Sequence, residues 1–229
     1  MTSITQKTAA NTCITPPQSL VLMKNMIRLS VSSICYLRNV FPADCFSSRD
    51  YAGLKVHQIE CAERDENGDT IVKNRDAFLL TQWLEKGVFE ALTARYLKTM
   101  SFTVYSKDAA GFDCVVETYS FAFEYPPDAP PTVNGQRMDR DSMKKQAVSF
   151  IRCLVEFAGT LEELPEDRWL TLKLTYYEET TPRDYEPPFF TAAASDALQF
   201  DRSVLRVKIG RIETPSHTLH LKFSGVDGS

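Results

Sequence analysis

The sequence of 229 residues has few of the residues that catalytic and nucleotide-binding sites need. It contains only nine glycines and three histidines. No G-x-G-x-x-G or G-x-x-x-x-G-K-[ST] run is present, which excludes the glycine-rich loops that cradle phosphates. The six cysteines include no Cys-x-x-Cys pair, which excludes zinc-ribbon and thioredoxin-like sites. A net charge of −4, without a run of lysine and arginine, argues against nucleic-acid binding as the main function.

Long apolar runs are also scarce. No stretch approaches the roughly 20 residues that a membrane span needs, and residues 1–18 are polar and lack a signal-peptide core. We therefore expect no membrane partner. The cysteines fit free thiols in a reducing nucleus or cytosol. Cys35 and Cys153 lie in apolar helical contexts and are expected to be small buried residues.

The histidines do not form a recognisable catalytic or metal site. His217 and His220 are three positions apart on an expected strand, so their side chains point to opposite faces and cannot hold one ion. A Cys/His hydrolase needs a thiolate beside a histidine, and no nucleophile signature surrounds Cys45 or Cys61. We predict no catalytic residue, no metal site and no cofactor. The alternative is an enzyme with an unrecognised site built from Cys45, Cys61, His57 and His220.

Hydrophobic periodicity predicts both helices and strands. The first helix begins after the N-cap Thr15, with Pro16 in its first turn and Gln18 completing a capping box, and runs to about Val40. The other expected elements are helices 76–98 and 141–158, strands 54–61, 102–105, 118–125, 169–176, 205–209 and 219–223, and loops 63–75 and 126–135. Strands that cluster between helices and are joined by hairpins predict an α+β domain, in which helices cover one face of a largely antiparallel sheet.

The segment 176–190 is the most informative part of the chain. It holds three prolines, five aromatic residues and four acids, without helical or strand periodicity. Aromatic rings need burial, but proline lacks the backbone donor that a central strand requires. We interpret the segment as an extended strap across a surface, the alternative being an ordinary ordered loop.

A strap in this position suggests a peptide-binding mechanism. An extended partner can add to an exposed edge of strand 169–176 through main-chain hydrogen bonds. If the strap passes over the partner, release requires the strap to move, which slows dissociation. In the alternative arrangement, strand 205–209 completes the sheet and blocks this edge.

The same segment resembles the start of the C-terminal safety belt of HORMA domains, in the meiotic chromosome-axis branch. The matching residues are Tyr176, Tyr177, Glu178, Glu179, Thr181, Pro182, Asp184, Tyr185, Pro187, Pro188 and Phe190. Arg183 stands where a second proline is common. The resemblance extends through residues 36–42, 83–92 and 96–98 and covers nearly the whole chain, and plant and algal axis proteins look most similar. Such proteins usually continue beyond this domain, so we expect either an excised domain or a short paralogue.

The resemblance implies a HORMA fold and an adaptor that is not an enzyme. Such an adaptor captures closure-motif peptides of meiotic axis or cohesin-associated partners on chromosomes in the nucleus, and supports homologue pairing, synapsis and recombination. We expect a flexible tail at 1–14, the HORMA domain at 15–223 with its belt at 176–223, and a C-terminal tail at 224–229. The expected peptide-binding residues are Leu172, Leu174, Tyr176, Tyr177, Tyr185, Phe189, Phe190 and Val207.

Two further partner sites follow from the resemblance. Arg152 matches an arginine that serves homotypic contacts in checkpoint-type HORMA proteins, although a helix-surface arginine is more often merely solvated. An AAA+ remodelling ATPase is implied to act on the N-terminal segment 1–18. Direct nucleic-acid binding by the domain is not expected. The alternatives within the fold are spindle-checkpoint and translesion-polymerase adaptors, and the run 185–190 favours the meiotic branch.

Overall fold

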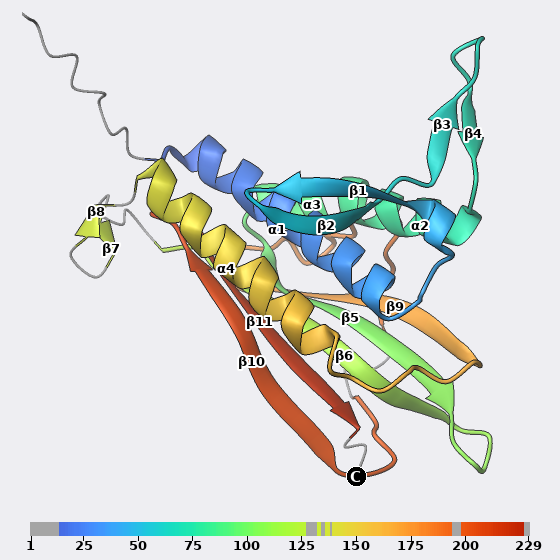
Figure 1. Cartoon of the computed structure of the whole chain (residues 1–229). Coiled ribbons are helices and arrows are strands. Elements are labelled where there is room, and N and C mark those ends of the chain that lie inside the picture. The colour runs from blue at the N-terminus through green and yellow to red at the C-terminus, as the bar shows by residue number, and fades with distance from the viewer. Residues whose placement is uncertain (1–13, 127–131, 134–135, 138, 194–197, 227–229) are drawn as a thin grey trace, which may run out of the picture.

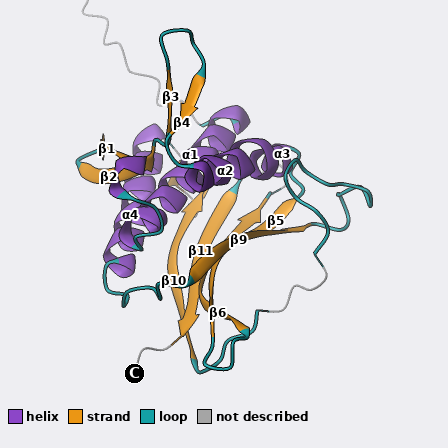
Figure 2. Ribbon diagram, turned by 90° about the vertical axis from the view of Figure 1, so that its right-hand side faces the viewer, coloured by secondary structure: helices purple, strands orange, loops and turns teal. Residues whose placement is uncertain are grey.

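The computed structural model describes residues 14–126, 132–133, 136–137, 139–193 and 198–226. At its centre is a five-stranded sheet in the order β10-β11-β6-β5-β9, with every neighbouring pair antiparallel. The strands are β5 (Leu97–Lys107), β6 (Asp113–Glu124), β9 (Arg168–Tyr176), β10 (Val204–Glu213) and β11 (Thr218–Val226). Figures 1 and 2 show the helices gathered on one face of this sheet, which confirms the α+β prediction.

The first helix, α1 (Pro16–Leu37), begins as predicted. The Thr15 side chain accepts a hydrogen bond from the Gln18 backbone, and the Gln18 side chain accepts one from the Thr15 backbone, which completes the capping box. The helix ends three residues before the expected Val40, because Asn39 takes a positive φ of 50° that an α-helix cannot continue through.

α1 also corrects the expectation that no stretch could span a membrane. It is the one helix among the described residues that is long and apolar enough to do so by length and composition. However, 56% of the qualifying window is buried inside the protein, and the side chains of Met23, Met26, Ile27 and Ile34 are fully buried. Its apolar character therefore serves the core of this fold.

The predicted helix 76–98 is wrong in its regularity and its end. The chain instead forms α2 (Arg75–Gln82), a π-helical segment η2 (Trp83–Val88) and α3 (Phe89–Thr93). Arg95 has a φ of 62°, which ends the helix, and β5 starts at Leu97. A π-helical turn is invisible to an analysis that assumes 3.6 residues per turn.

Two small hairpins flank the helices. β1 (Phe46–Tyr51), which follows the short helix η1 (Ala43–Cys45), was not predicted, and it pairs with β2 (Leu54–Ile59). β3 (Ala62–Arg64) and β4 (Thr70–Val72) form a hairpin that replaces most of the expected loop 63–75 and projects from the body in Figure 1. In the expected loop 126–135, the structure describes Pro126 and β7 (Thr132–Val133), which pairs with β8 (Gln136–Arg137).

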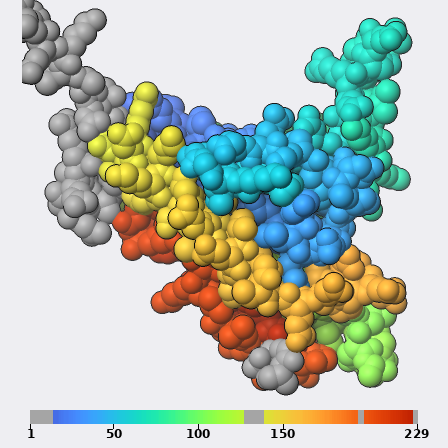
Figure 3. Space-filling view, viewed as in Figure 1, coloured from blue at the N-terminus to red at the C-terminus, as the bar shows by residue number. Residues whose placement is uncertain are grey.

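The hydrophobic core lies between the sheet and the helices. β6 contributes Tyr119, Phe121 and Phe123, each at most 1% exposed. α4 (Arg140–Ala158) lies across β10, and Figure 3 shows it beside α1 and the β1–β2 hairpin on the helical face of the molecule. Cys35 is buried as predicted, but Cys153 is exposed, because it lies outside the inward-facing stripe of α4.

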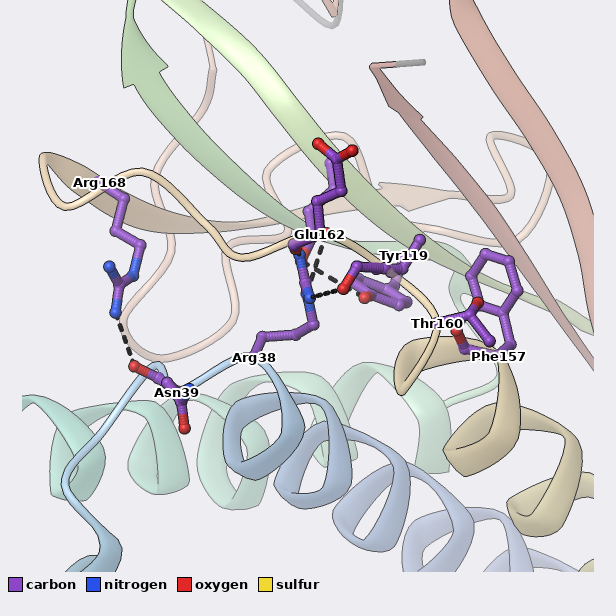
Figure 4. Close-up of polar contacts among 9 residues, drawn as sticks. Arg38, Asn39, Tyr119, Phe157, Thr160, Glu162 and Arg168 are labelled. Carbon is purple, nitrogen blue, oxygen red and sulfur yellow. Dashed lines mark hydrogen bonds and ion pairs between the residues drawn. The ribbon is translucent and has the colours of Figure 1, made fainter. Parts of the chain in front are cut away.

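A buried ion pair ties the end of α1 to the sheet. The guanidinium of Arg38 donates from Nε to the Glu117 carboxylate at 3.1 Å, and its other nitrogens donate to the backbone oxygens of Leu161 and Glu162. Both charged side chains are at most 6% exposed. Burial raises the pKa of Glu117, and Arg38 opposes that rise. Figure 4 shows Arg38 in reach of the loop that follows α4.

The same region positions the start of β9. Arg168 donates to the backbone oxygen of Asn39 at 2.6 Å and to that of Pro165 at 2.7 Å, and Figure 4 shows the first of these contacts. The end of α1 and the loop after α4 therefore fix where β9 enters the sheet.

Candidate functional site

β9 is an edge strand of the five-stranded sheet. It pairs with β5 on one side, and no other described strand lies along its other side. Leu172 and Leu174 face the helical core, as the alternation predicted. An exposed edge presents a row of unpaired backbone N–H and C=O groups, which can pair with an additional strand.

The segment 177–203 connects β9 to β10 and includes most of the predicted strap 176–190. From here on, the whole segment 177–203 is called the strap. Its start is tied to the sheet, because the Tyr177 backbone N–H donates to the Tyr96 carbonyl at 2.9 Å. The Tyr177 hydroxyl donates to the carbonyl of Phe123 at 2.7 Å. The amides of Thr180 and Thr181 then donate back to the Tyr177 carbonyl, which turns the chain away from the strand direction.

Tyr185 anchors the strap to the end of the sheet and to α3. Its ring makes edge-to-face contacts with Tyr96 and Tyr176, at centroid distances of 5.0 and 5.4 Å. Its hydroxyl donates to the carboxylate of Glu90 at 3.3 Å. Burial, followed by the nearby Glu90 charge, raises the pKa of Tyr185, so the ring stays neutral at physiological pH.

A second anchor is a notch at Gly87 in the π-helical segment. A β-carbon on Gly87 would lie 2.6 Å from the carbonyl oxygen of Pro188 and closer still to the Phe190 ring. Only glycine permits this approach of strap and helix. Phe189 does not enter the notch; it has a φ of 72°, is 52% exposed, and carries the Lys86 ammonium over its ring at 5.8 Å.

Between β9 and the strap lies a groove of about 520 Å³. One wall is β9 and the other is the first half of the strap. The lining residues are Leu172, Lys173, Leu174, Tyr176, Arg183, Asp184, Tyr185, Glu186, Pro187, Phe190, Thr191, Ala192 and Ala193. Burial raises the pKa of Tyr176 to about 12, so this wall is uncharged where the tyrosine lies.

Five of the eight residues expected to bind a peptide line this groove, namely Leu172, Leu174, Tyr176, Tyr185 and Phe190. The other three lie elsewhere. Tyr177 lines a neighbouring hollow with Tyr125, Phe189 points outward, and Val207 is on β10 at the opposite edge of the sheet. The alternating pattern around Val207 identified its strand but not that strand's neighbours, and its role in peptide binding stays a prediction.

The far end of the strap leads to the opposite edge of the sheet. The Val115 backbone N–H donates to the Gln199 carbonyl at 2.8 Å, after which β10 begins. β10 joins the sheet through β11, so it does not block the edge of β9. The strap therefore spans from one edge of the sheet to the other, as Figure 2 shows for its described parts.

A buried polar cluster holds the turn between β10 and β11 against α1. The Ser19 hydroxyl lies 2.5 Å from the Thr214 hydroxyl and 2.6 Å from Nδ1 of His217. The Thr214 hydroxyl donates to the His217 carbonyl at 2.7 Å. One chain of donors satisfies all three contacts: His217 Nδ1–H to Ser19, Ser19 to Thr214, and Thr214 to the carbonyl.

The charge state of this cluster follows from its burial. Desolvation, assisted by the nearby Arg95 charge, lowers the pKa of His217 to about 4, so the imidazole is neutral at physiological pH. This cluster could not be predicted from local sequence patterns, because Ser19 and His217 are far apart in the chain. Gly87 did carry a signal, since a glycine inside a helical pattern commonly has a packing reason.

The structure places the two cysteines of the enzyme alternative together, but without the properties of a nucleophile. Cys45 and Cys61 are buried in a small cluster with Ala77, and burial raises the pKa of both thiols, opposite to what a nucleophile requires. His57 stacks on Tyr36, and His220 lies on β11. Among the described residues, no group of three or more His, Cys, Asp or Glu side chains could hold a metal ion. Arg152 is exposed on α4, and its interface role stays a prediction.

Comparison with known proteins agrees with this architecture. The family model for the HORMA domain matches residues 19–217. The meiosis-specific protein ASY1 of Arabidopsis thaliana is 29% identical over 93% of this chain and 37% of its own length. HORMA domain-containing protein 1 of Xenopus laevis is 32% identical over 91% of this chain and 52% of its own length. The chain thus spans between about a third and just over half of these relatives.

Solved structures share the fold. Caenorhabditis elegans HTP-2 bound to a HIM-3 closure motif aligns with a TM-score of 0.76 and 19% identity, over 93% of this chain and 92% of that one. A chain of the mitotic checkpoint complex aligns with a TM-score of 0.65 and 16% identity, over 91% of this chain and 99% of that one. These matches and the family model confirm the resemblance found in the sequence: the chain belongs to the HORMA domain family.

Proposed function

We propose that this chain is a meiotic HORMA adaptor that captures a closure-motif peptide between β9 and the strap. The observation that carries the proposal is the unpaired edge of β9, which faces a groove walled by an anchored strap. A peptide bound there would add a strand to the sheet through its backbone, while its side chains would meet the apolar and polar residues of the groove.

The comparisons supply the biological class of partner. The curated relatives include a meiosis-specific protein, and several structures with the same fold hold closure motifs of HIM-3 or HTP-3. We infer a partner from the meiotic chromosome axis, a location on meiotic chromosomes in the nucleus, and a role in pairing, synapsis and recombination. In this scheme residues 15–223 form the domain and 176–223 its safety belt, and the protein acts as an adaptor rather than a catalyst.

The experiment is a fluorescence-polarisation titration with tiled peptides from meiotic axis proteins, recording both association and dissociation. The proposal predicts saturable binding of a discrete peptide with slow release. Release should accelerate in Gly87→Ala, in which the strap is displaced from its notch. Absence of binding by every axis peptide, or equally fast release with and without an intact notch, would contradict capture by the strap.

A further inference from the structure

The face of the sheet turned away from the helices carries a row of five polar residues, three of which are lysines. The cross-strand register aligns one residue from each strand: Lys208, Lys222, Ser120, Ser101 and Lys173. Residues directly opposite each other in antiparallel strands project from the same face. The row therefore runs from one edge of the sheet to the other, and its two ends are positively charged.

The adjacent rows reinforce this charge. On one side the register aligns Arg206 with Ser224, and on the other side Arg211 with His220. Acids lie at both ends of the strands on this face: Glu213 pairs with Arg211 and Glu124 lies 3.3 Å from His220 at one end, and Asp113 pairs with Lys107 at the other.

The part of this surface on β10 and β11 is not neutralised by any ion pair among the described residues. Within the described ranges, Arg206, Lys208 and Lys222 take part in none of the ion pairs, and all three are exposed.

The pairing of Lys208 with Lys222 is unfavourable for folding. Like charges directly opposite each other destabilise a sheet. Lysines on an edge strand deter unwanted pairing, which accounts for Lys208 on β10. This reason does not apply to Lys222, because β11 pairs on both sides, with β10 and with β6. An anionic ligand would offset the repulsion that the fold itself leaves in place.

We propose that this surface binds an acidic flank of the captured peptide. The inference rests on the proposed function and extends it by naming the chemistry outside the groove. The row begins at Lys173, which also lines the groove, so the groove and the cationic surface are continuous. Four inter-strand spacings of about 4.8 Å give roughly 19 Å from β9 to β10, which about six extended residues span.

The test compares tailed versions of the axis peptide captured in the titration above. To this captured peptide, six-residue tails of alternating Asp and Glu (acidic) or of Ser and Asn (neutral) are added at either terminus. Binding is measured to wild type, to the double variant Lys208→Gln/Lys222→Gln, and to a charge-matched control, Lys144→Gln/Lys145→Gln, which removes two exposed lysines of α4.

We expect the acidic tail at one terminus to bind wild type about fivefold more tightly than the neutral tail at low salt. The preference should vanish in Lys208→Gln/Lys222→Gln, persist in the α4 control, and shrink as salt is raised. Equal binding of both tails to wild type, or equal loss in both double variants, would contradict this inference alone. The inference would also be contradicted if a 20-base-pair DNA duplex bound through the same two lysines while the acidic and neutral tails bound equally well. Failure to capture any core peptide would contradict the proposed function, and this inference with it.

Discussion

The two edges of the sheet are protected in different ways. The β10 edge carries exposed cations, including Arg206 and Lys208, which discourage another strand from pairing there. The β9 edge has leucines turned to the core and is screened instead by the strap, which stands off far enough to leave a groove. Charged side chains on an edge strand deter pairing with a partner strand. A strap that leaves a groove beside the edge allows a partner strand to pair and then slows its release.

The two edges also differ in how they are fastened. The start of the strap, beside β9, is held by aromatic and close-packed contacts to the helical layer. At the other edge, the turn between β10 and β11 is held to α1 by a small polar cluster. Apolar packing of large rings generally contributes more stability than neutral hydrogen bonds, so the anchors beside β9 should be the stronger ones.

The largest effect is expected from Tyr185→Ala. The substitution removes two ring contacts and the bond to Glu90, and should lower the free energy of unfolding by about 3 kcal/mol. Denaturant unfolding and peptide release should both report the loss. Tyr185→Phe keeps the rings and should cost less than about 1 kcal/mol. Equal losses in the two variants would show that the ring packing is not the anchor.

Gly87→Ala should have the next largest effect. Its β-carbon cannot coexist with Pro188 and Phe190 in their present positions, so the strap must shift, at a cost of about 1–3 kcal/mol. We expect about tenfold faster peptide release, measured by competition with unlabelled peptide, because a cost of about 1.4 kcal/mol corresponds to tenfold. Gly159→Ala is the control, since it adds the same methyl group at the end of α4, where the nearest atom is 3.3 Å away. Similar release rates in both variants would argue against the notch.

At the other edge, Ser19→Ala should lower the free energy of unfolding by about 1–2 kcal/mol, because it leaves buried polar atoms of Thr214 and His217 without a partner. Hydrogen exchange should show the β10–β11 turn opening more often, while β9 is unchanged. Ser48→Ala, at an exposed position of β1, is the control and should be nearly neutral. Loosening of β9 rather than of the turn would break the distinction between the two edges.

The same cluster predicts a smaller dependence on pH. His217 has a pKa of about 4 when folded, against about 6.5 when unfolded. Between these values the unfolded state binds more protons, so the contribution of His217 to stability falls as pH is lowered from 6.5 to 4. The difference in unfolding free energy between wild type and His217→Gln should therefore change across that window. A constant difference would mean that His217 is not buried as described.

The smallest effect on capture is expected from deleting residues 1–12. These residues lie outside the described part of the chain, and the AAA+ ATPase that the family resemblance implies would act on this segment. Peptide affinity and unfolding should be unchanged, while ATP-driven release should be lost. Unchanged ATP-driven release would show that the ATPase does not need the N-terminal segment.

Local signals predicted much of this architecture. The capping box at Thr15, the alternation in β9 and the prolines of the strap are all short-range patterns, and each marked its element correctly. Five of the residues expected to bind a peptide line the groove, because the strap and β9 are adjacent in sequence.

The missed features depend on contacts between distant residues. The notch joins Gly87 to Phe190, and the polar cluster joins Ser19 to His217. Val207 was expected to bind a peptide as part of the belt, but the position of its strand at the opposite edge of the sheet was not predicted. Periodicity identifies which side of a strand is buried, but strand order is set by the packing of the whole domain.

The most direct test of the central claim is hydrogen exchange of the backbone amides in β9 and β10, with and without the captured peptide. If the peptide adds to the β9 edge beneath the strap, amides within Arg168–Tyr176 should gain protection, and those within Val204–Glu213 should not. Protection gained at β10 with β9 unchanged would contradict the account.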